Sequence, residues 1–230
     1  AMTDAPGSPP DTSLSEAMST LRAVRRLRPD PIPTEVLNRV LQAACWAPTG
    51  GNQQPWRVVV VQDPERKAAL AEIYRPEWYR YIDNPGMAKR IEAMTDEARA
   101  GWTRMTTAGS YLADNLAEAP AILLFCADFR RMAVTDAGLD RQSLVGGGSV
   151  YPPVQNAMLA CVAEGLGCTL TTLHCLREDE VKAALDIPDP WATAALVPIG
   201  YPVLRGHGPI SRQGPEVMAY QDTFGTPYQP

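Results

Sequence analysis

The chain has 230 residues and a mass of 25.0 kDa; 45% of the residues are hydrophobic and 20% are charged. This balance is typical of one globular domain that folds in water, and it argues against a disordered or membrane-spanning chain. The net charge of -5 argues against nucleic acid or an anionic membrane as a partner, because both normally require a basic surface.

Apolar runs, the first residues, cysteines and histidines narrow the class of protein further. No apolar run reaches the about 18 to 20 residues of a membrane helix, and no charged start precedes an apolar core, so we expect a cytoplasmic protein. Five cysteines without a Cys-x-x-Cys pair are interpreted as buried thiols of a reducing compartment, and two isolated histidines predict no metal site. Residues 1–12 are predicted to be a disordered tail before a single domain at 13–230.

The first helix is expected over residues 14–27. Ser13 and Glu16 form a capping-box pattern, and Met18, Leu21 and Val24 follow at helical spacing. The prolines at 29 and 31 end this helix, because proline lacks an amide donor and disfavours helix at the residue before it.

Three arginines, Arg22, Arg25 and Arg26, would share one face of that helix. Like charges at this spacing destabilise a helix by about 0.2–0.5 kcal/mol per pair unless a bound anion neutralises them. A bound phosphate would do so, since the arginine fork matches its oxygens; the alternative is a solvated basic face paired with surface acids.

Residues 34–47 read as a second amphipathic helix, residues 57–61 as a buried strand and residues 65–74 as a helix. The connection at 47–56 is Ala-Pro-Thr-Gly-Gly-Asn-Gln-Gln-Pro-Trp, longer than the about two to six residues that such a connection needs. Its glycines and carboxamides can bring donors close to a flat polar ring; an ordinary connection is the alternative.

Residues 75–116 are predicted to be loosely packed helices that form a lid. Their aromatic residues include Trp78, Trp102 and Tyr111, which we expect to contact a planar substrate. The alternative is that these aromatics only hold small helices together.

The second half alternates strands and helices. Strands are expected at 121–127, 168–173 and 193–199, and helices at 153–164 and 178–185. A glycine-rich loop is expected at 141–149, and a C-terminal extension at 200–230 that packs against another surface. The small, hydroxyl-bearing strand after Gly165 to Gly167 would offer backbone amides to a ligand edge, although an ordinary strand has the same composition. Arg212 would return a cation to the first helix.

The order of these motifs resembles the nitroreductase family. The stretch from Arg22 to Pro33, the 47–56 connection, the Gly165 to Gly167 segment, the strand ending at 198–202, and Arg212 before Glu216 are all similar to that family's pattern. The 47–56 connection is the most specific of them, and together the motifs cover nearly the whole chain.

The resemblance implies an α+β fold, a mixed central sheet surrounded by helices, and an intertwined homodimer with FMN at the subunit interface. It implies that Arg22, Ala23, Arg25, Arg26 and Arg212 hold the FMN phosphate and ribityl chain. The ring would be reached by the partner's loop and by the late strand, whose backbone amide near Thr172 would face flavin N5. The loop residues are Pro48, Thr49, Gly50, Gly51, Asn52 and Gln54, and the strand residues are Thr171, Thr172 and Leu173.

The implied activity is ping-pong reduction of nitroaromatic or other conjugated small molecules with NADPH or NADH. Two departures stand out: the family usually has serine at Ala23 and an aromatic residue at Leu27, so one bond to the phosphate is missing here or is made by another residue. Alternatives are other reactions of the flavin fold (alkene reduction, dehalogenation, flavin fragmentation), a non-catalytic flavin-binding protein, or a phosphate-binding regulator without flavin.

Overall fold

The computed structural model describes residues 12–228, so all of the predicted tail except Thr12 lies outside the described residues. The strands are β1 (Trp56–Val61), β2 (Ala121–Ala127), β3 (Gly167–Cys168) and β4 (Ala192–Gly200). The helices are α1 (Leu14–Thr20), α2 (Thr34–Cys45), α3 (Pro64–Ile82), α4 (Pro85–Glu92), α5 (Asp96–Asn115), α6 (Tyr151–Ala163), α7 (Glu178–Ala184) and α8 (Pro215–Met218).

The four strands form one sheet in the order β1-β2-β4-β3, and every pair in it is antiparallel. The α+β class is therefore confirmed, whereas the expectation of a mixed sheet is wrong for residues 12–228. Each connection between hydrogen-bonded neighbours brings the chain back in the opposite direction, so no parallel pair arises among the described strands.

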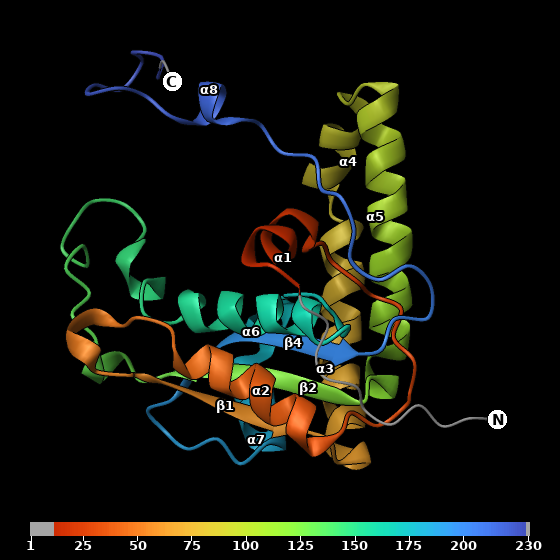
Figure 1. The fold of residues 1–230 in the computed structure, drawn as a ribbon. Coiled ribbons are helices and arrows are strands. Elements are labelled where there is room, and N and C mark those ends of the chain that lie inside the picture. Colours follow the sequence, from red (N-terminus) through yellow and green to blue (C-terminus); the bar gives the residue numbers. More distant parts are fainter. Residues whose placement is uncertain (1–11, 229–230) are drawn as a thin grey trace.

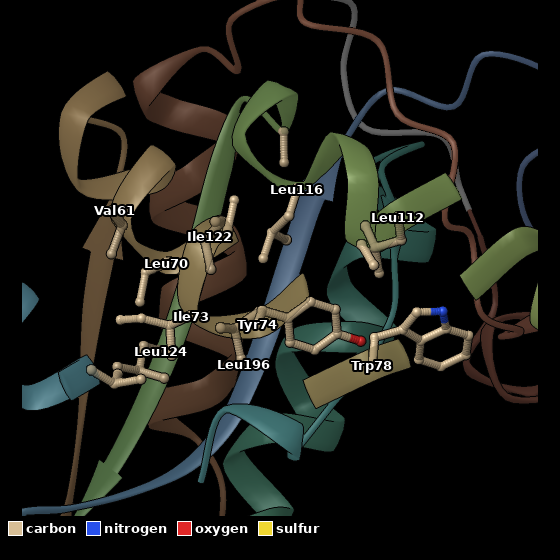
Figure 2. Packing of buried hydrophobic residues seen from close by; sticks show 14 of the residues in the cluster. Val61, Leu70, Ile73, Tyr74, Trp78, Leu112, Leu116, Ile122, Leu124 and Leu196 are labelled. Atoms are coloured by element: carbon tan, nitrogen blue, oxygen red, sulfur yellow. The ribbon is translucent and has the colours of Figure 1, made fainter. Parts of the chain in front are cut away.

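Helices cover both faces of this sheet (Figure 1). Along β2, Ile122 and Leu124 point into a core shared with α3, α5 and α7, while Leu123 and Phe125 point into a core shared with α2 and α6. Successive strand residues point to opposite faces, so a fully buried central strand must be apolar throughout, as 121–127 is. Figure 2 shows the first core, where Leu70 and Tyr74 of α3 lie beside Leu196 of β4.

The predicted lid is better packed than its sequence suggests. Helix α3 begins at an Asp63 cap, continues through Pro76 and packs along α5. Trp78 is only 6% exposed and donates its indole N–H to Ser110 at 3.0 Å. A Cβ on Gly109 of α5 would lie 2.1 Å from the Trp78 ring, so the glycine makes room for it. Trp78 is thus a core residue, which corrects its prediction as a substrate contact.

The first helix is seven residues shorter at its end than predicted, since it stops at Thr20 rather than at residue 27. The Ser13 cap is present, because the Glu16 amide donates to Ser13 Oγ at 3.1 Å. Further on, Val24 donates its amide to the Cys168 carbonyl, and Leu27 bridges Pro202. Sheet-like pairing with distant segments outweighs the helical spacing of the sequence, so the arginines do not share a helix face.

Two other predictions need correction. The strand expected at 168–173 shrinks to β3 plus an isolated bridge at Thr171, because residues 173–177 turn into a short 3-10 helix. Cys45 and Cys175 are exposed, unlike the buried thiols expected, while the other three cysteines are buried. Within residues 12–228, no helix is both long and apolar enough to cross a bilayer.

Candidate functional site

An extended stretch, residues 21–28, carries the predicted arginines; we call it the arginine segment. It lies between β3 and residues 201–208. Val203 donates its amide to the Arg26 carbonyl, Arg28 to the Tyr201 carbonyl, and Gly208 to the Thr20 carbonyl. Backbone hydrogen bonds on both sides therefore hold the segment extended, and the arginine side chains project from it.

His207 fastens the same segment. Its Nδ1 lies 3.0 Å from the Arg22 carbonyl oxygen and its Nε2 lies 2.9 Å from the Leu166 carbonyl oxygen. The neutral ring can donate Nε2–H to Leu166 and accept the Arg22 amide N–H at Nδ1, at 3.4 Å, whereas the imidazolium donates to both carbonyls. Burial works to lower the pKa of His207, but hydrogen bonding to Cys168 and to the two carbonyls outweighs it, and the pKa is raised.

A cleft of about 400 Å³, which we call cleft A, opens on one side of the arginine segment. It brings together cations that are far apart in the sequence, Arg22 and Arg25 with Arg212. Polar and apolar groups complete its wall: Met18, Leu21, Ala23, Gln155, Met158, Thr169, Leu170 and Ile210. The predicted return of Arg212 to the N-terminal arginines is thus present in the structure.

A second cleft of about 380 Å³, cleft B, shares Arg22, Ala23 and Arg25 of the arginine segment with cleft A. Arg22 and Arg25 line it too, together with Arg26, and two further arginines join them: Arg104 of α5 and Arg205. No aspartate or glutamate among the described residues lines either cleft. The two added cations were missed in the sequence because nothing in their local pattern links them to residue 26.

The charge balance of these clefts is the central observation. Nine arginine or lysine side chains form ion pairs among residues 12–228, and none of the six arginines that line clefts A and B is among them. The chain as a whole carries a net charge of -5. An external anion would stabilise six cations gathered without acids on an acidic protein, because like charges held together repel one another.

Arg25 is the most enclosed of these cations. Burial lowers its pKa from the usual arginine value, with the Tyr74 hydroxyl opposing that shift, and no hydrogen bond from its guanidinium is present within the described residues. The Thr171 hydroxyl donates to Tyr74 Oη at 3.3 Å. A partly desolvated guanidinium with unused donors is prepared to bind an anion, since the cost of removing water has already been met by folding.

Residues 48–54, the second predicted element, form an exposed and strained loop. Gly51, Asn52 and Gln54 all have positive φ, at 56°, 53° and 47°. Left-handed backbone in non-glycine residues is uncommon and clusters at functional sites. The Gln54 amide donates to Thr49 Oγ1 at 3.1 Å, and the Gly50 amide donates to Ser149 Oγ at 3.0 Å, so the loop is held in this shape.

Within one chain this loop does not meet the arginine clefts. Pro48 to Gln54 line neither cleft A nor cleft B, and Gly50 and Gly51 instead border a groove with residues 131–133, 145, 148 and 149. Figure 1 shows the loop beyond the end of α2, on the opposite side of the molecule from the chain between α1 and α2. The two predicted halves of the site therefore face different surfaces of the chain.

Residues 169–173, which we call the late segment, contribute side chains to two clefts. Thr169 and Leu170 line cleft A, whereas Thr172 lines a more apolar cleft of about 440 Å³, cleft C, with Phe129, Tyr151 and Cys175. Thr171 is half-buried against Leu196, and Leu173 packs against the α3 core. Of the three predicted ring contacts, Thr172 alone is an exposed cleft residue, and Leu173 has a packing role.

The remaining predicted substrate residues both lie on α5. Tyr111 is half-buried, and the Arg26 guanidinium stacks on its ring with Cζ 4.3 Å from the centroid, so Tyr111 orients a cation at cleft B. Trp102 is half-buried nearer the start of the same helix.

Known proteins are similar to this chain in sequence and in fold. A sequence model described as the nitroreductase family matches residues 20–201. The chain belongs to the nitroreductase family. The match includes the arginine segment, the 48–54 loop and the late segment.

Relatives with curated names carry several different activities. The chain is 30% identical over 186 residues to an NADH dehydrogenase of Thermus thermophilus, which covers 81% of this chain and 85% of that protein. It is 31% identical over 201 residues to 5,6-dimethylbenzimidazole synthase of Rhodospirillum rubrum, covering 84% and 85%. It is 28% identical to iodotyrosine deiodinase 1 of Rattus norvegicus, covering 81% of this chain and 61% of that protein.

Solved structures share the fold. An iodotyrosine deiodinase bound to FMN and 3-iodo-L-tyrosine superposes with a TM-score of 0.67 at 24% identity, covering 92% of this chain and all of that one. The NADPH:FMN oxidoreductase of Vibrio harveyi, complexed with NAD+, gives a TM-score of 0.64 at 20% identity, covering 94% and 77%.

Proposed function

We propose that this member of the nitroreductase family is an FMN-dependent oxidoreductase that uses NADPH or NADH to reduce nitroaromatic or other conjugated small molecules. The observation that carries the proposal is the group of arginines without acidic partners around cleft A. Family membership supplies the reaction class, and names of relatives such as the Vibrio NADPH:FMN oxidoreductase support the cofactor.

The residues of cleft A fit FMN. Its single phosphate needs charged donors, and Arg22, Arg25 and Arg212 supply them from two separate segments. The Thr169 hydroxyl and the Gln155 carboxamide add donors and acceptors suited to a sugar-alcohol chain. Ala23 has no hydroxyl to offer where the family usually has serine, and Arg212 and Gln155 on the same cleft can donate to the phosphate in its place.

A second copy of the chain would complete the site. The 48–54 loop presents strained, exposed amide and carboxamide groups on a surface away from cleft A, so it fits a role in the partner's site. The C-terminal extension points the same way: after Gly208 it leaves the body and carries α8 outward (Figure 1). Its apolar side chains stay uncovered, with Phe224 93% exposed and Met218 67% exposed. Burying them against a partner would be favourable, which supports the homodimer.

The protein's own contribution would be binding and electrostatics. When bound, FMN supplies the reversible two-electron chemistry. Arg25, enclosed and unpaired among the described residues, would stabilise negative charge next to it, since a preorganised cation costs nothing to reorient. Cleft C, with Thr172, Tyr151 and Phe129 on its walls, is the apolar space that would seat a planar acceptor beside the late segment.

Reductive dehalogenation is a second candidate function, supported by the curated deiodinase relative. The discriminating feature is acceptor choice rather than cofactor, because both reactions draw on the same reduced flavin. Steady-state assays with one NADPH-reduced preparation against a nitroaromatic, an activated alkene and an iodophenol would separate them. Turnover of the nitroaromatic or alkene supports the first proposal, and turnover of the iodophenol alone replaces it with the second.

A further inference from the structure

We propose that cleft B is a second phosphate site, separate from the FMN site, and that it binds the phosphate groups of the dinucleotide electron donor. The inference rests on the proposed function for the identity of the donor, and on the structure for the site itself. Arg26, Arg104 and Arg205 line cleft B and not cleft A, whereas Arg212 and Gln155 line cleft A and not cleft B. Arg22, Ala23 and Arg25 of the arginine segment line both clefts, so the two sites are neighbours that differ in their remaining residues.

Charge balance shows why one phosphate is too little. A phosphate monoester carries a charge of about -1.5 to -2 at neutral pH, and the cations of cleft A are enough to neutralise it. Arg26, Arg104 and Arg205 remain without ion pairs among the described residues, and no acid lines their cleft there. A ligand with two or more further phosphates would neutralise them, and a reduced nicotinamide dinucleotide carries a pyrophosphate, with a third phosphate in NADPH.

The geometry of the cleft is partly prepared for such a ligand. The Arg26 Cζ lies 4.3 Å from the centroid of the Tyr111 ring, so a cation–π contact positions this guanidinium. Arg22 donates Nε and Nη2 to the Gly206 carbonyl at 3.2 and 3.0 Å, so it is held between the two clefts. Fixed guanidinium groups lose less side-chain entropy on binding phosphate than free ones do.

The wall of cleft B also has an apolar side. Met105 and Ala108 of α5 and Leu204 lie next to the arginines. A dinucleotide has this combination of phosphates with flat aromatic and sugar surfaces, whereas a bare inorganic ion would use the cations only. Cleft B therefore fits an organic phosphate better than it fits a free anion.

The test uses the FMN-loaded protein at low ionic strength, where exposed charge pairs are least screened. Calorimetric titration with NADP+, NAD+ and sodium pyrophosphate would compare the wild type with Arg104→Ala/Arg205→Ala. The matched control is Arg99→Ala, since Arg99 lies on the same helix, donates to the Met94 carbonyl and does not line the cleft. FMN content is measured for every sample, with Arg212→Ala as the marker for cleft A.

We expect the double variant to bind NADP+ at least about tenfold more weakly, the loss typical of one charge-assisted hydrogen bond, with FMN content and the Arg99→Ala control unchanged. A loss for NADP+ alone assigns the extra phosphate to cleft B, and an equal loss for NAD+ and pyrophosphate assigns the pyrophosphate. Unchanged NADP+ binding in the double variant overturns the proposal, as does loss of FMN, which would make cleft B part of the cofactor site.

Two further outcomes keep this inference distinct from the proposed function. If the wild type takes up no FMN, the proposed function fails, and the pyrophosphate titration on the flavin-free protein still decides whether cleft B binds phosphate. The proposal is wrong if pyrophosphate does not bind and Arg104→Glu/Arg205→Glu converts a dimer into a monomer in size-exclusion chromatography. In that case, acidic residues of a second copy form ion pairs with these arginines.

Discussion

His174 should make the protein lose stability in mild acid. This residue follows Thr172 and Leu173, is 1% exposed, and its Nδ1 finds no hydrogen-bond partner among the described residues. Burial lowers its pKa to about 4, although the nearby Glu178 works in the other direction. The folded chain therefore holds His174 neutral at a pH where the unfolded chain has already bound the proton.

The sign and size of the effect follow from linkage. The His174 pKa is about 4 in the folded chain, against an ordinary value near 6.5. Holding the ring neutral therefore leaves the free energy of unfolding unchanged above pH 7 and lowers it as pH falls toward 4. One pKa unit corresponds to about 1.4 kcal/mol, so the full loss is about 3 kcal/mol below pH 4, and about 2 kcal/mol is lost at pH 5.

The assay is urea unfolding of the wild type and of His174→Phe at pH 8 and pH 5. Carboxylates titrate in both proteins, so the difference between them isolates His174. We expect the wild type to lose about 2 kcal/mol more than the variant on going to pH 5. Equal losses in the two proteins would refute the idea that burial keeps this ring neutral.

The remaining predictions concern His207, the α5 glycines and the 48–54 loop. Because the pKa of His207 is raised, the protonated ring stabilises the folded arginine segment fully below about pH 6.5, and this stabilisation fades as pH rises. His207→Gln should therefore retain less flavin than the wild type at pH 6, and the difference should close toward pH 9. A difference that does not depend on pH would contradict this. Gly109→Ala should destabilise the fold by about 1–3 kcal/mol through collision with Trp78, whereas Gly101→Ala on the same helix, whose added Cβ would meet only the end of Arg104 at 3.8 Å, should stabilise it by up to about 1 kcal/mol; urea midpoints that move in the same direction would argue against the packing described. Gln54→Gly should relieve a φ of 47° and raise the urea midpoint while lowering flavin retention; a fall in both quantities would indicate that the side chain, rather than backbone strain, sets the loop shape.

The sequence was most informative where local pattern and tertiary environment agree. Residues 121–127 are apolar throughout because β2 is central and covered on both faces, and the predicted strand coincides with the observed one. The Ser13 cap also appears where expected, since it depends on neighbouring residues alone. Of the four arginines that the sequence grouped, Arg22, Arg25 and Arg212 line one cleft, whereas Arg26 lines the other.

The failures come from contacts between distant parts of the chain. The helical spacing of Val24 and Leu27 could not reveal that β3 and residues 201–203 would capture their backbone. Trp78 looked like a lid residue because only Gly109, far along the chain on α5, makes its burial possible. Arg104, Arg205 and His207 carry no local motif, and they become site residues only when α5 and the C-terminal extension meet the arginine segment.

The central claim is that this chain holds a flavin that a reduced nicotinamide can reduce. The most direct measurement is the visible absorbance spectrum of the purified, FMN-reconstituted protein, recorded before and after anaerobic addition of NADPH or NADH, beside Arg25→Ala. We expect flavin bands that bleach promptly in the wild type, and loss of the flavin on gel filtration of the variant, because Arg25 is the enclosed cation of cleft A. A wild-type protein that stays colourless after addition of FMN would contradict the claim.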